Sequence, residues 1–334
     1  MKSRGLEDKG AIMENIKEID TQISFTNPIG ITNIGDPFIL RDNNGLFFLY
    51  ATSFIDGFRV WRSSDLSDWK DCGICYEPGK DSFGYEDFWA PEVVCHNDRY
   101  IMHYSARWKK NKSLRIGVAV SDSPLGPFID ISDSPMFDLG YPAIDGHVFV
   151  DDDGEKYFYF AKDCSENVVD GKHESHMMVA RLDDSLEALA TEPVFLFKAE
   201  HPWETMCDPG WSWNEGPFML KQNQLYYLMY SANCYASKEY SICYAVSDSP
   251  MGPFIKGTDN PILAFREGLV SGPGHNSVIK LGDELLCAYH VHTDYDNPSQ
   301  NRQVYFDKMH FENGQIKIDG PTVGQKILFG GVNL

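Results

Sequence analysis

Short apolar runs alternate with polar turns along most of the chain. The runs are rich in aromatic and β-branched side chains, and they end at turns such as Asn43-Asn44-Gly45 and Asp152-Asp153-Gly154. This pattern is typical of short β-strands joined by tight turns. We expect strands over residues 46–50, 58–61, 100–104, 116–120, 156–160, 225–230, 241–246 and 285–289. No long helical period separates them, so the predicted class is all-β.

Five of these runs begin with a related motif. The motifs centre on Asp36, Ala90, Asp145, Glu215 and His275, which are 54, 55, 70 and 60 residues apart. A period of this size is the signature of a radial array that contributes one sheet per repeat. The sequence therefore predicts a five-bladed β-propeller in which the motif of every blade faces one central axis.

A second repeat supports the same organisation. The segment Ser121-Asp-Ser-Pro-Leu-Gly-Pro-Phe128 recurs as Ser247-Asp-Ser-Pro-Met-Gly-Pro-Phe254. Each copy follows an apolar run, and its Pro and Gly residues suit a turn between the third and fourth strands of a blade. We expect a polar leader over residues 1–25, with a short helix at 12–19, and one propeller domain over 26–334. The long segment between residues 160 and 215 should form a pocket wall.

The composition narrows the choice of partners. The chain has 334 residues, is 43% hydrophobic and has a net charge of −20. Such a charge disfavours nucleic acid or an anionic membrane as partner, whereas a neutral ligand such as a sugar is compatible with it. No apolar run is long enough to cross a membrane, and residues 1–20 lack the apolar core of a signal peptide. We therefore expect a cytoplasmic protein.

The eight cysteines give little indication of chemistry. Only Cys72 and Cys75 have the spacing of a metal or redox pair, and no second pair accompanies them. A zinc ribbon needs two such pairs, and a thioredoxin-like motif needs a βαβ context. We expect reduced thiols that pack as small apolar side chains.

Three of the five motif positions carry an acid. A single Asp before a strand is usually a turn former. Asp36, Asp145 and Glu215, however, would meet at one axis, where like charges are costly to hold together unless a site uses them. Two carboxyl groups on either side of a sugar ring are what glycoside hydrolysis requires, with one as acid and the other as base or nucleophile. Burial and repulsion would keep one of them protonated near neutral pH.

These motifs resemble those of glycoside hydrolase family 43, whose members are five-bladed β-propellers. The resemblance covers about residues 25 to 320 and rests on the combination of five segments: Gly35-Asp-Pro-Phe38, Trp89-Ala-Pro-Glu-Val93, Asp145-Gly-His-Val-Phe149, Glu215-Gly-Pro-Phe218 and Gly272-Pro-Gly-His-Asn-Ser277. The resemblance implies an inverting mechanism with Asp36 as general base and Glu215 as general acid. It implies that Asp145 holds Glu215 in position and tunes its pKa.

Further residues are candidates for binding substrate, although core packing is the alternative for any single aromatic side chain. Phe88 and Trp89 are the first candidates for a sugar platform, and Trp211 and Trp213 would line a wall. Arg302 occupies a place where the resemblance implies a cation that faces the site, although a surface arginine is an equally good interpretation. His147 follows Asp145 by two residues and would share its face if the strand alternates regularly.

His275 matches the histidine of the fifth blade in this family, beside which a structural calcium or sodium is often bound. A lone histidine is more often structural, and calcium prefers oxygen ligands. His290 and His292 also alternate on a predicted strand, but they receive no role. No cofactor is expected to take part in the chemistry.

Several functions remain open. The first is an exo-acting enzyme that releases xylose or arabinose from plant cell-wall oligosaccharides, as a β-xylosidase or α-L-arabinofuranosidase. An endo-α-1,5-L-arabinanase would use the same three acids in an open groove. A retaining, invertase-like enzyme is disfavoured because its Asn-Asp-Pro-Asn-Gly, Arg-Asp-Pro and Glu-Cys segments are absent. A propeller that only binds sugar is the non-catalytic alternative.

Overall fold

The computed structural model describes residues 21–53 and 55–332. Within these residues, the only helix is the short 3-10 turn η1 (Pro202–Glu204), and strands make up the regular structure. The all-β class predicted from the sequence is thus confirmed. The helix expected at 12–19 lies outside the described residues.

Most strands belong to five four-stranded antiparallel sheets, each built from strands in chain order. The first sheet contains β2 (Ile34–Arg41), β3 (Phe47–Ser53), β4 (Phe58–Ser63) and β5 (Lys70–Tyr76). The second contains β6 (Gly84–His96), β7 (Arg99–Trp108), β8 (Leu114–Ser121) and β9 (Ile129–Asp130). The third contains β10 (Ala143–Val150), β11 (Lys156–Lys162), β14 (His176–Arg181) and β15 (Val194–Lys198). The fourth contains β17 (Asn214–Gln222), β18 (Leu225–Ala232), β19 (Ser241–Ser247) and β20 (Ile255–Lys256). The fifth contains β21 (Gly274–Leu281), β22 (Glu284–His292), β23 (Arg302–Glu312) and β24 (Gln315–Ile318).

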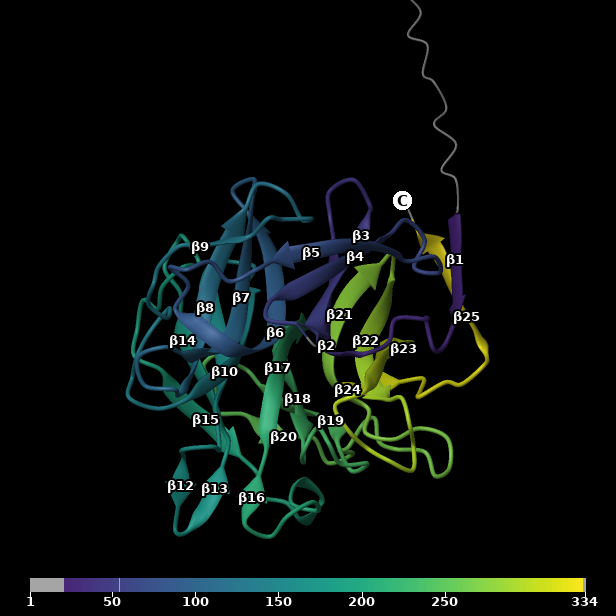
Figure 1. Ribbon diagram of the computed structural model, residues 1–334. Coiled ribbons are helices and arrows are strands. Elements are labelled where there is room, and N and C mark those ends of the chain that lie inside the picture. Colours follow the sequence, from purple (N-terminus) through teal and green to yellow (C-terminus); the bar gives the residue numbers. More distant parts are fainter. Residues whose placement is uncertain (1–20, 54, 333–334) are drawn as a thin grey trace, which may run out of the picture.

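The first strands of the five sheets lie next to one another in a closed sequence. β2 contacts β6, β6 contacts β10, β10 contacts β17, β17 contacts β21, and β21 contacts β2 again (Figure 1). Each of these five strands contains one of the repeated motifs. The motifs therefore meet where the sheets converge, although they are spread over about 240 residues of sequence.

Two smaller sheets complete the structure. β1 (Thr21–Thr26) pairs with β25 (Lys326–Val332), so the two ends of the described chain lie side by side. The predicted leader ends at residue 25, which lies inside β1. The alternating side chains of Ile23 and Phe25 are buried in the core. The second small sheet joins β12 (Val168–Val169), β13 (Lys172–Glu174) and β16 (Trp211–Ser212) within the long segment between the third and fourth sheets.

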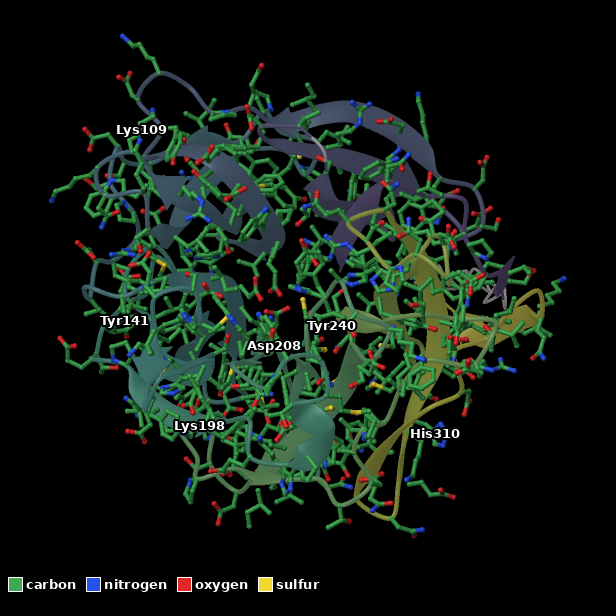
Figure 2. All side chains as sticks on the ribbon, turned by 60° about the horizontal axis from the view of Figure 1, so that its bottom comes forward. Lys109, Tyr141, Lys198, Asp208, Tyr240 and His310 are labelled. Atoms are coloured by element: carbon green, nitrogen blue, oxygen red, sulfur yellow. The ribbon has the colours of Figure 1, made fainter. Side chains whose placement is uncertain are left out.

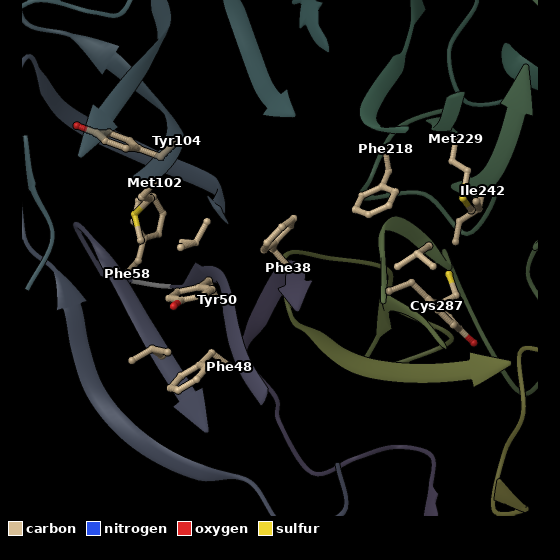
Figure 3. Packing of buried hydrophobic residues seen from close by; sticks show 14 of the residues in the cluster. Phe38, Phe48, Tyr50, Phe58, Met102, Tyr104, Phe218, Met229, Ile242 and Cys287 are labelled. Atoms are coloured by element: carbon tan, nitrogen blue, oxygen red, sulfur yellow. The ribbon is translucent and has the colours of Figure 1, made fainter. Parts of the chain in front are cut away.

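Aromatic side chains fill the space between the sheets. The largest buried cluster includes Phe38, Tyr50, Phe58, Tyr104 and Phe218, which come from sheets one, two and four (Figure 3). Burial of one such side chain contributes about 1.5–3 kcal/mol. These contacts between different sheets are therefore a main source of stability. The two Ser-Asp-Ser-Pro segments join β8 to β9 and β19 to β20, as the repeat predicts.

The described residues include no helix that is long and apolar enough to span a membrane. All eight cysteines are free thiols, and four of them, Cys75, Cys164, Cys243 and Cys287, are buried. Cys72 is only partly buried and forms no disulfide with Cys75.

Candidate active site

A β-bulge lies at the motif of every innermost strand. In each sheet the first strand advances three residues while its partner advances two, between residues 35 and 38, 89 and 92, 144 and 147, 215 and 218, and 274 and 277. The residue after the first of each pair has a positive φ: Asp36 54°, Ala90 45°, Asp145 58°, Gly216 59° and His275 51°. Bulges re-aim side chains and are frequent beside functional sites.

In the fourth sheet, the bulge lies one residue away from the position that the sequence motif predicts. Gly216, not Glu215, is the structural equivalent of Asp36 and Asp145. Glu215 lies one residue earlier, at the position that Trp89 occupies in the second sheet. The three acids therefore do not share one repeat position. They meet because both positions of the bulge face the same cavity.

That cavity has a volume of about 410 Å³, within the usual range for a small-molecule site. Its walls include all three predicted acids and most of the other predicted site residues: Asp36, Asp145, Glu215, Phe88, Trp89, Trp213, His275 and Arg302. The segment between 160 and 215 supplies Asp163, Cys164, Ser165 and Trp211, as expected for a pocket wall. In Figure 2 the end of the molecule that carries β12, β13 and β16 comes forward, and Tyr240 is labelled near the centre of the view.

Asp36 is held by several donors. The Arg302 guanidinium donates from Nη1 to Asp36 Oδ1 over 2.7 Å, and the Thr52 hydroxyl donates to Asp36 Oδ2 over 2.5 Å. His275 Nδ1 lies 3.4 Å from Oδ1. The backbone N–H of Asp36 donates to His290 Nδ1 over 3.0 Å, which requires an unprotonated nitrogen there.

Gly35 allows the arginine to approach, because a Cβ at that position would lie 1.9 Å from the Arg302 guanidinium carbon. The glycine of the Gly-Asp motif, which lacks a Cβ, therefore leaves room for the Arg302 guanidinium beside Asp36.

These neighbours keep Asp36 ionised. Burial alone would raise its pKa, but the nearby charge of Arg302 and the hydrogen bond from Thr52 lower the pKa well below the usual range. A carboxylate that stays charged at all ordinary pH values is suited to accept a proton.

Glu215 has the opposite environment. Its Oε1 accepts a hydrogen bond from the buried Tyr240 hydroxyl over 2.9 Å. Burial raises the pKa of Glu215 well above its usual value, and the negative charges of Asp145, Asp163 and Asp36 raise it further. A carboxyl group that remains protonated near neutral pH is suited to donate a proton.

Asp145 lies between these two cases. Its Oδ2 accepts a hydrogen bond from the backbone N–H of Gly216 over 2.9 Å. Burial raises the pKa of Asp145 to about 6, while the charge of His275 and the Gly216 bond act in the opposite direction. Through its bond to Gly216, the Asp145 carboxylate is held by the residue that directly follows Glu215.

Aromatic rings line one wall. Trp213 stacks on Trp211 with ring centroids 5.9 Å apart, and Trp211 stacks on His173 of β13 at 3.7 Å. Trp89 faces the cavity from the second sheet. Phe88 also borders the cavity but is only 3% exposed and packs against Phe58, so it belongs mainly to the core.

His147 does not lie in this cavity. It is buried, and its Nδ1 is 2.7 Å from Glu92 Oε2, next to the ring of Phe218. The prediction assumed regular strand alternation after Asp145. The extra residue of the bulge breaks that alternation and turns His147 toward the interior on the other side of the bulge.

The ion expected beside His275 remains a prediction. Within the part of the chain that the structure describes, no group of three or more His, Cys, Asp or Glu side chains is arranged to hold a metal. A calcium or sodium ion there would take most of its ligands from water oxygens.

Four contributors were not predicted from the sequence. They are Thr52, Asp163, Tyr240 and His290, which contact or electrostatically influence the acids. His290 had one usable signal, because it alternates with His292 on a predicted strand. Thr52 and Tyr240 contact acids of their own sheets, and Asp163 acts on Glu215 from the segment after β11. A single sequence reveals neither the register nor the packing on which these contacts depend.

Comparisons with known proteins agree with this geometry. The profile of the family described as glycosyl hydrolases family 43 matches residues 25–316. A solved structure described as a thermostable family-43 glycoside hydrolase is 47% identical, with a TM-score of 0.85, and the match covers 89% of this chain and 96% of that one.

Two curated relatives are more distant. A xylosidase/arabinosidase of Bacteroides ovatus is 32% identical over 216 residues, which are 59% of this chain and 64% of that protein. A β-D-galactofuranosidase of Aspergillus niger is 31% identical over 208 residues, 60% of this chain and 54% of that protein. The matches span less than two thirds of the length of either relative.

The all-β fold and the pocket lined by three carboxyl groups agree with the class of protein that these comparisons indicate, the glycoside hydrolases. The chain belongs to glycosyl hydrolases family 43, because the family profile matches most of its length.

Proposed function

We propose that this protein is an exo-acting, inverting glycosidase that releases xylose or arabinose from the end of an oligosaccharide. The observation that carries the proposal is the contrast between two carboxyl groups in one cavity. Asp36 is kept ionised by Arg302, whereas burial and neighbouring acids keep Glu215 protonated. Opposite protonation states of two carboxyl groups are what acid–base hydrolysis of a glycoside needs.

The proposed reaction is a single displacement. Glu215 donates its proton to the oxygen of the departing sugar as the bond from that oxygen to the anomeric carbon breaks. Asp36 removes a proton from a water molecule, whose oxygen forms the new bond to the anomeric carbon from the opposite side. Arg302 and Thr52 fix the Asp36 carboxylate by hydrogen bonds of 2.7 and 2.5 Å, so that its free lone pairs can face the water.

We further propose that the five sheets are the blades of a closed propeller. Two findings support this: each sheet has four antiparallel strands in chain order, and the contacts between the innermost strands return from β21 to β2. An ion beside His275, if bound, would be structural and would take no part in proton transfer.

Exo action is supported by the size of the cavity. A volume of about 410 Å³ is near the lower end of the range for small-ligand sites. The wall formed by Trp211, Trp213 and Asp163 limits its extent on one side. The name of the Bacteroides ovatus relative supports a pentose as the released sugar.

The experiment is hydrolysis of three aryl glycosides: a β-D-xyloside, an α-L-arabinofuranoside and a β-D-galactofuranoside. We expect cleavage of one of the two pentosides and a loss of at least about a hundredfold in Asp36→Ala. Glu215→Ala should lose activity mainly on substrates with poor leaving groups. Cleavage of the galactofuranoside alone would contradict the pentose assignment. If none of the three substrates is hydrolysed and a long arabinan chain is cleaved internally, the result would favour the endo-acting alternative.

A further inference from the structure

Backbone hydrogen bonds link each bulge to the preceding sheet. In four of the five sheets, the N–H of the positive-φ residue donates to a side chain on the second strand of the sheet before it. The pairs are Ala90 to Thr52 Oγ1 (2.8 Å), Asp145 to Ser105 Oγ (3.0 Å), His275 to Ser231 Oγ (2.7 Å) and Asp36 to His290 Nδ1 (3.0 Å). These buried N–H groups are thus satisfied across the boundary between sheets.

The four acceptors occupy one structural position. Thr52 pairs with Gly35, Ser105 with Trp89, Ser231 with Glu215, and His290 with Gly274, always the first residue of the bulge. In the third sheet the same position, opposite Ile144, is Ala161. An alanine side chain has no acceptor, so the N–H of the next bulge residue, Gly216, needs another partner.

That partner is the Asp145 carboxylate, which accepts the Gly216 N–H over 2.9 Å. Among the described residues, this N–H is the hydrogen-bond donor seen at the Asp145 side chain. Since Gly216 directly follows Glu215, the bond ties the Asp145 carboxylate to the backbone that carries the acid.

We propose that Ala161 is a positioning residue, because the lack of an acceptor in its side chain leaves the Gly216 N–H to hold Asp145 beside Glu215. The proposal rests on the proposed hydrolytic function for its effect on rate, but its geometric part is independent of that function. Ala161 is fully buried next to Ile144 and Leu114, so no solvent group replaces the acceptor.

The matched substitution is Ala161→Ser, which introduces at this position the hydroxyl that Ser105 and Ser231 carry in the neighbouring sheets. We expect the introduced hydroxyl to accept the Gly216 N–H and the Asp145 carboxylate to move away from it. Ala161→Gly is the control, because it changes packing without adding an acceptor. Thermal melting of both variants shows whether they are folded.

The first readout is a crystal structure of the wild type and of each variant. The proposal predicts that Gly216 N is bonded to Asp145 in the wild type and in Ala161→Gly, and to the introduced hydroxyl in Ala161→Ser. An unchanged Asp145–Gly216 bond in Ala161→Ser would overturn it. This readout does not depend on activity, so an inactive wild type would contradict the proposed function and leave the structural test intact.

The second readout is kinetic. For Ala161→Ser we expect kcat to fall about tenfold or more on an aryl glycoside with a poor leaving group and less than about threefold on one with a good leaving group, with KM nearly unchanged. Ala161→Gly should keep the leaving-group dependence of the wild type. Equal losses on both substrates, or the same loss in Ala161→Gly, would show that Ala161 acts only through packing and would reject the positioning role.

Discussion

At the residue scale, the site works through contrasting surroundings of chemically similar groups. Asp36 faces Arg302 and Thr52, whereas Glu215 is surrounded by other acids and receives one hydrogen bond from Tyr240. Holding a buried carboxyl group near other negative charges costs stability.

Asp145→Asn should stabilise the protein in a pH-dependent way. The pKa of Asp145 is raised from 3.8 to about 6 in the folded state, so folding takes up protons and stability falls as pH rises through this window. Above it, the carboxylate costs on the order of 3 kcal/mol relative to a neutral side chain. Asparagine avoids this cost and keeps an oxygen for the Gly216 N–H. Urea unfolding should show the gain near pH 7.5 and little difference near pH 3.5.

The exposed Asp133 is a suitable control for that comparison. Asp133→Asn should change the free energy of unfolding by less than about 0.5 kcal/mol at either pH. A variant at Asp145 that is less stable than the wild type at neutral pH would contradict the burial argument.

Tyr240→Phe should move the alkaline limb of the pH–activity profile to higher pH. The Tyr240 hydroxyl donates to Glu215 Oε1 and thereby favours the ionised acid, which lowers its pKa. Without this bond, Glu215 remains protonated to higher pH, because the negative charges of Asp36, Asp145 and Asp163 still raise its pKa. The phenylalanine ring preserves the stack on His290, whose centroid is 5.5 Å away.

The control is Tyr289→Phe, which removes an equally buried hydroxyl bonded to Asp307. That change should lower stability and leave the profile in place. A shift of the Tyr240→Phe profile toward lower pH would be incompatible with the assigned hydrogen bond.

At the element scale, the bulge of each innermost strand decides which side chains reach the cavity. The motifs and their spacing predicted the strands, the turns and the meeting of three acids. They did not predict that Glu215 is out of step with Asp36 and Asp145, because the bulge has two adjacent positions that both face the pocket. The same extra residue explains why His147 was assigned to the wrong side.

Contacts between neighbouring strands and loops of the same sheet could not be predicted from the sequence either. Thr52 and Tyr240 are ordinary strand or loop residues in the chain, and their partners Asp36 and Glu215 are 16 and 25 residues away. Their roles depend on register and on the rotation of neighbouring strands. A single sequence specifies these only through the complete fold.

Gly35→Ala tests the requirement for a small residue before the first bulge. A Cβ at this position would overlap the Arg302 guanidinium, so the arginine must move away from Asp36. We expect kcat/KM to fall about a hundredfold, as for an ångström-scale displacement of a catalytic group. Gly79→Ala is the control, since its Cβ would meet no atom within 4 Å. Equal activity of the two variants would argue against a role for the Arg302–Asp36 contact.

At the scale of the whole molecule, strands β1 and β25 stabilise the fold from outside the site. β25 pairs with β1, and the fully buried Phe329 stacks on Phe25 with ring centroids 5.9 Å apart. These residues belong to a core cluster that also contains residues of the first and fifth sheets. The terminal pair therefore bridges the two sheets that complete the contacts around the axis.

Phe329→Ala should cost about 3–5 kcal/mol of stability. Because the cluster is separate from the cavity, kcat of the folded variant should stay within about twofold of the wild type. Denaturant unfolding and steady-state kinetics below the midpoint check both parts. Leu328→Ala, at a neighbouring position that is 41% exposed, should be nearly neutral. A small loss at Phe329 would mean that the terminal strands contribute little to the fold.

The proposed mechanism is a single displacement by the Asp36–Glu215 pair. The most direct test is proton NMR of the sugar released in the first minutes of hydrolysis, before its anomers equilibrate. We predict that the first product has the anomeric configuration opposite to that of the substrate, and that Asp36→Ala yields no such product. Release of a sugar with the configuration of the substrate would contradict the role of Asp36 as a base acting on water, and would require a carboxylate that attacks the sugar itself.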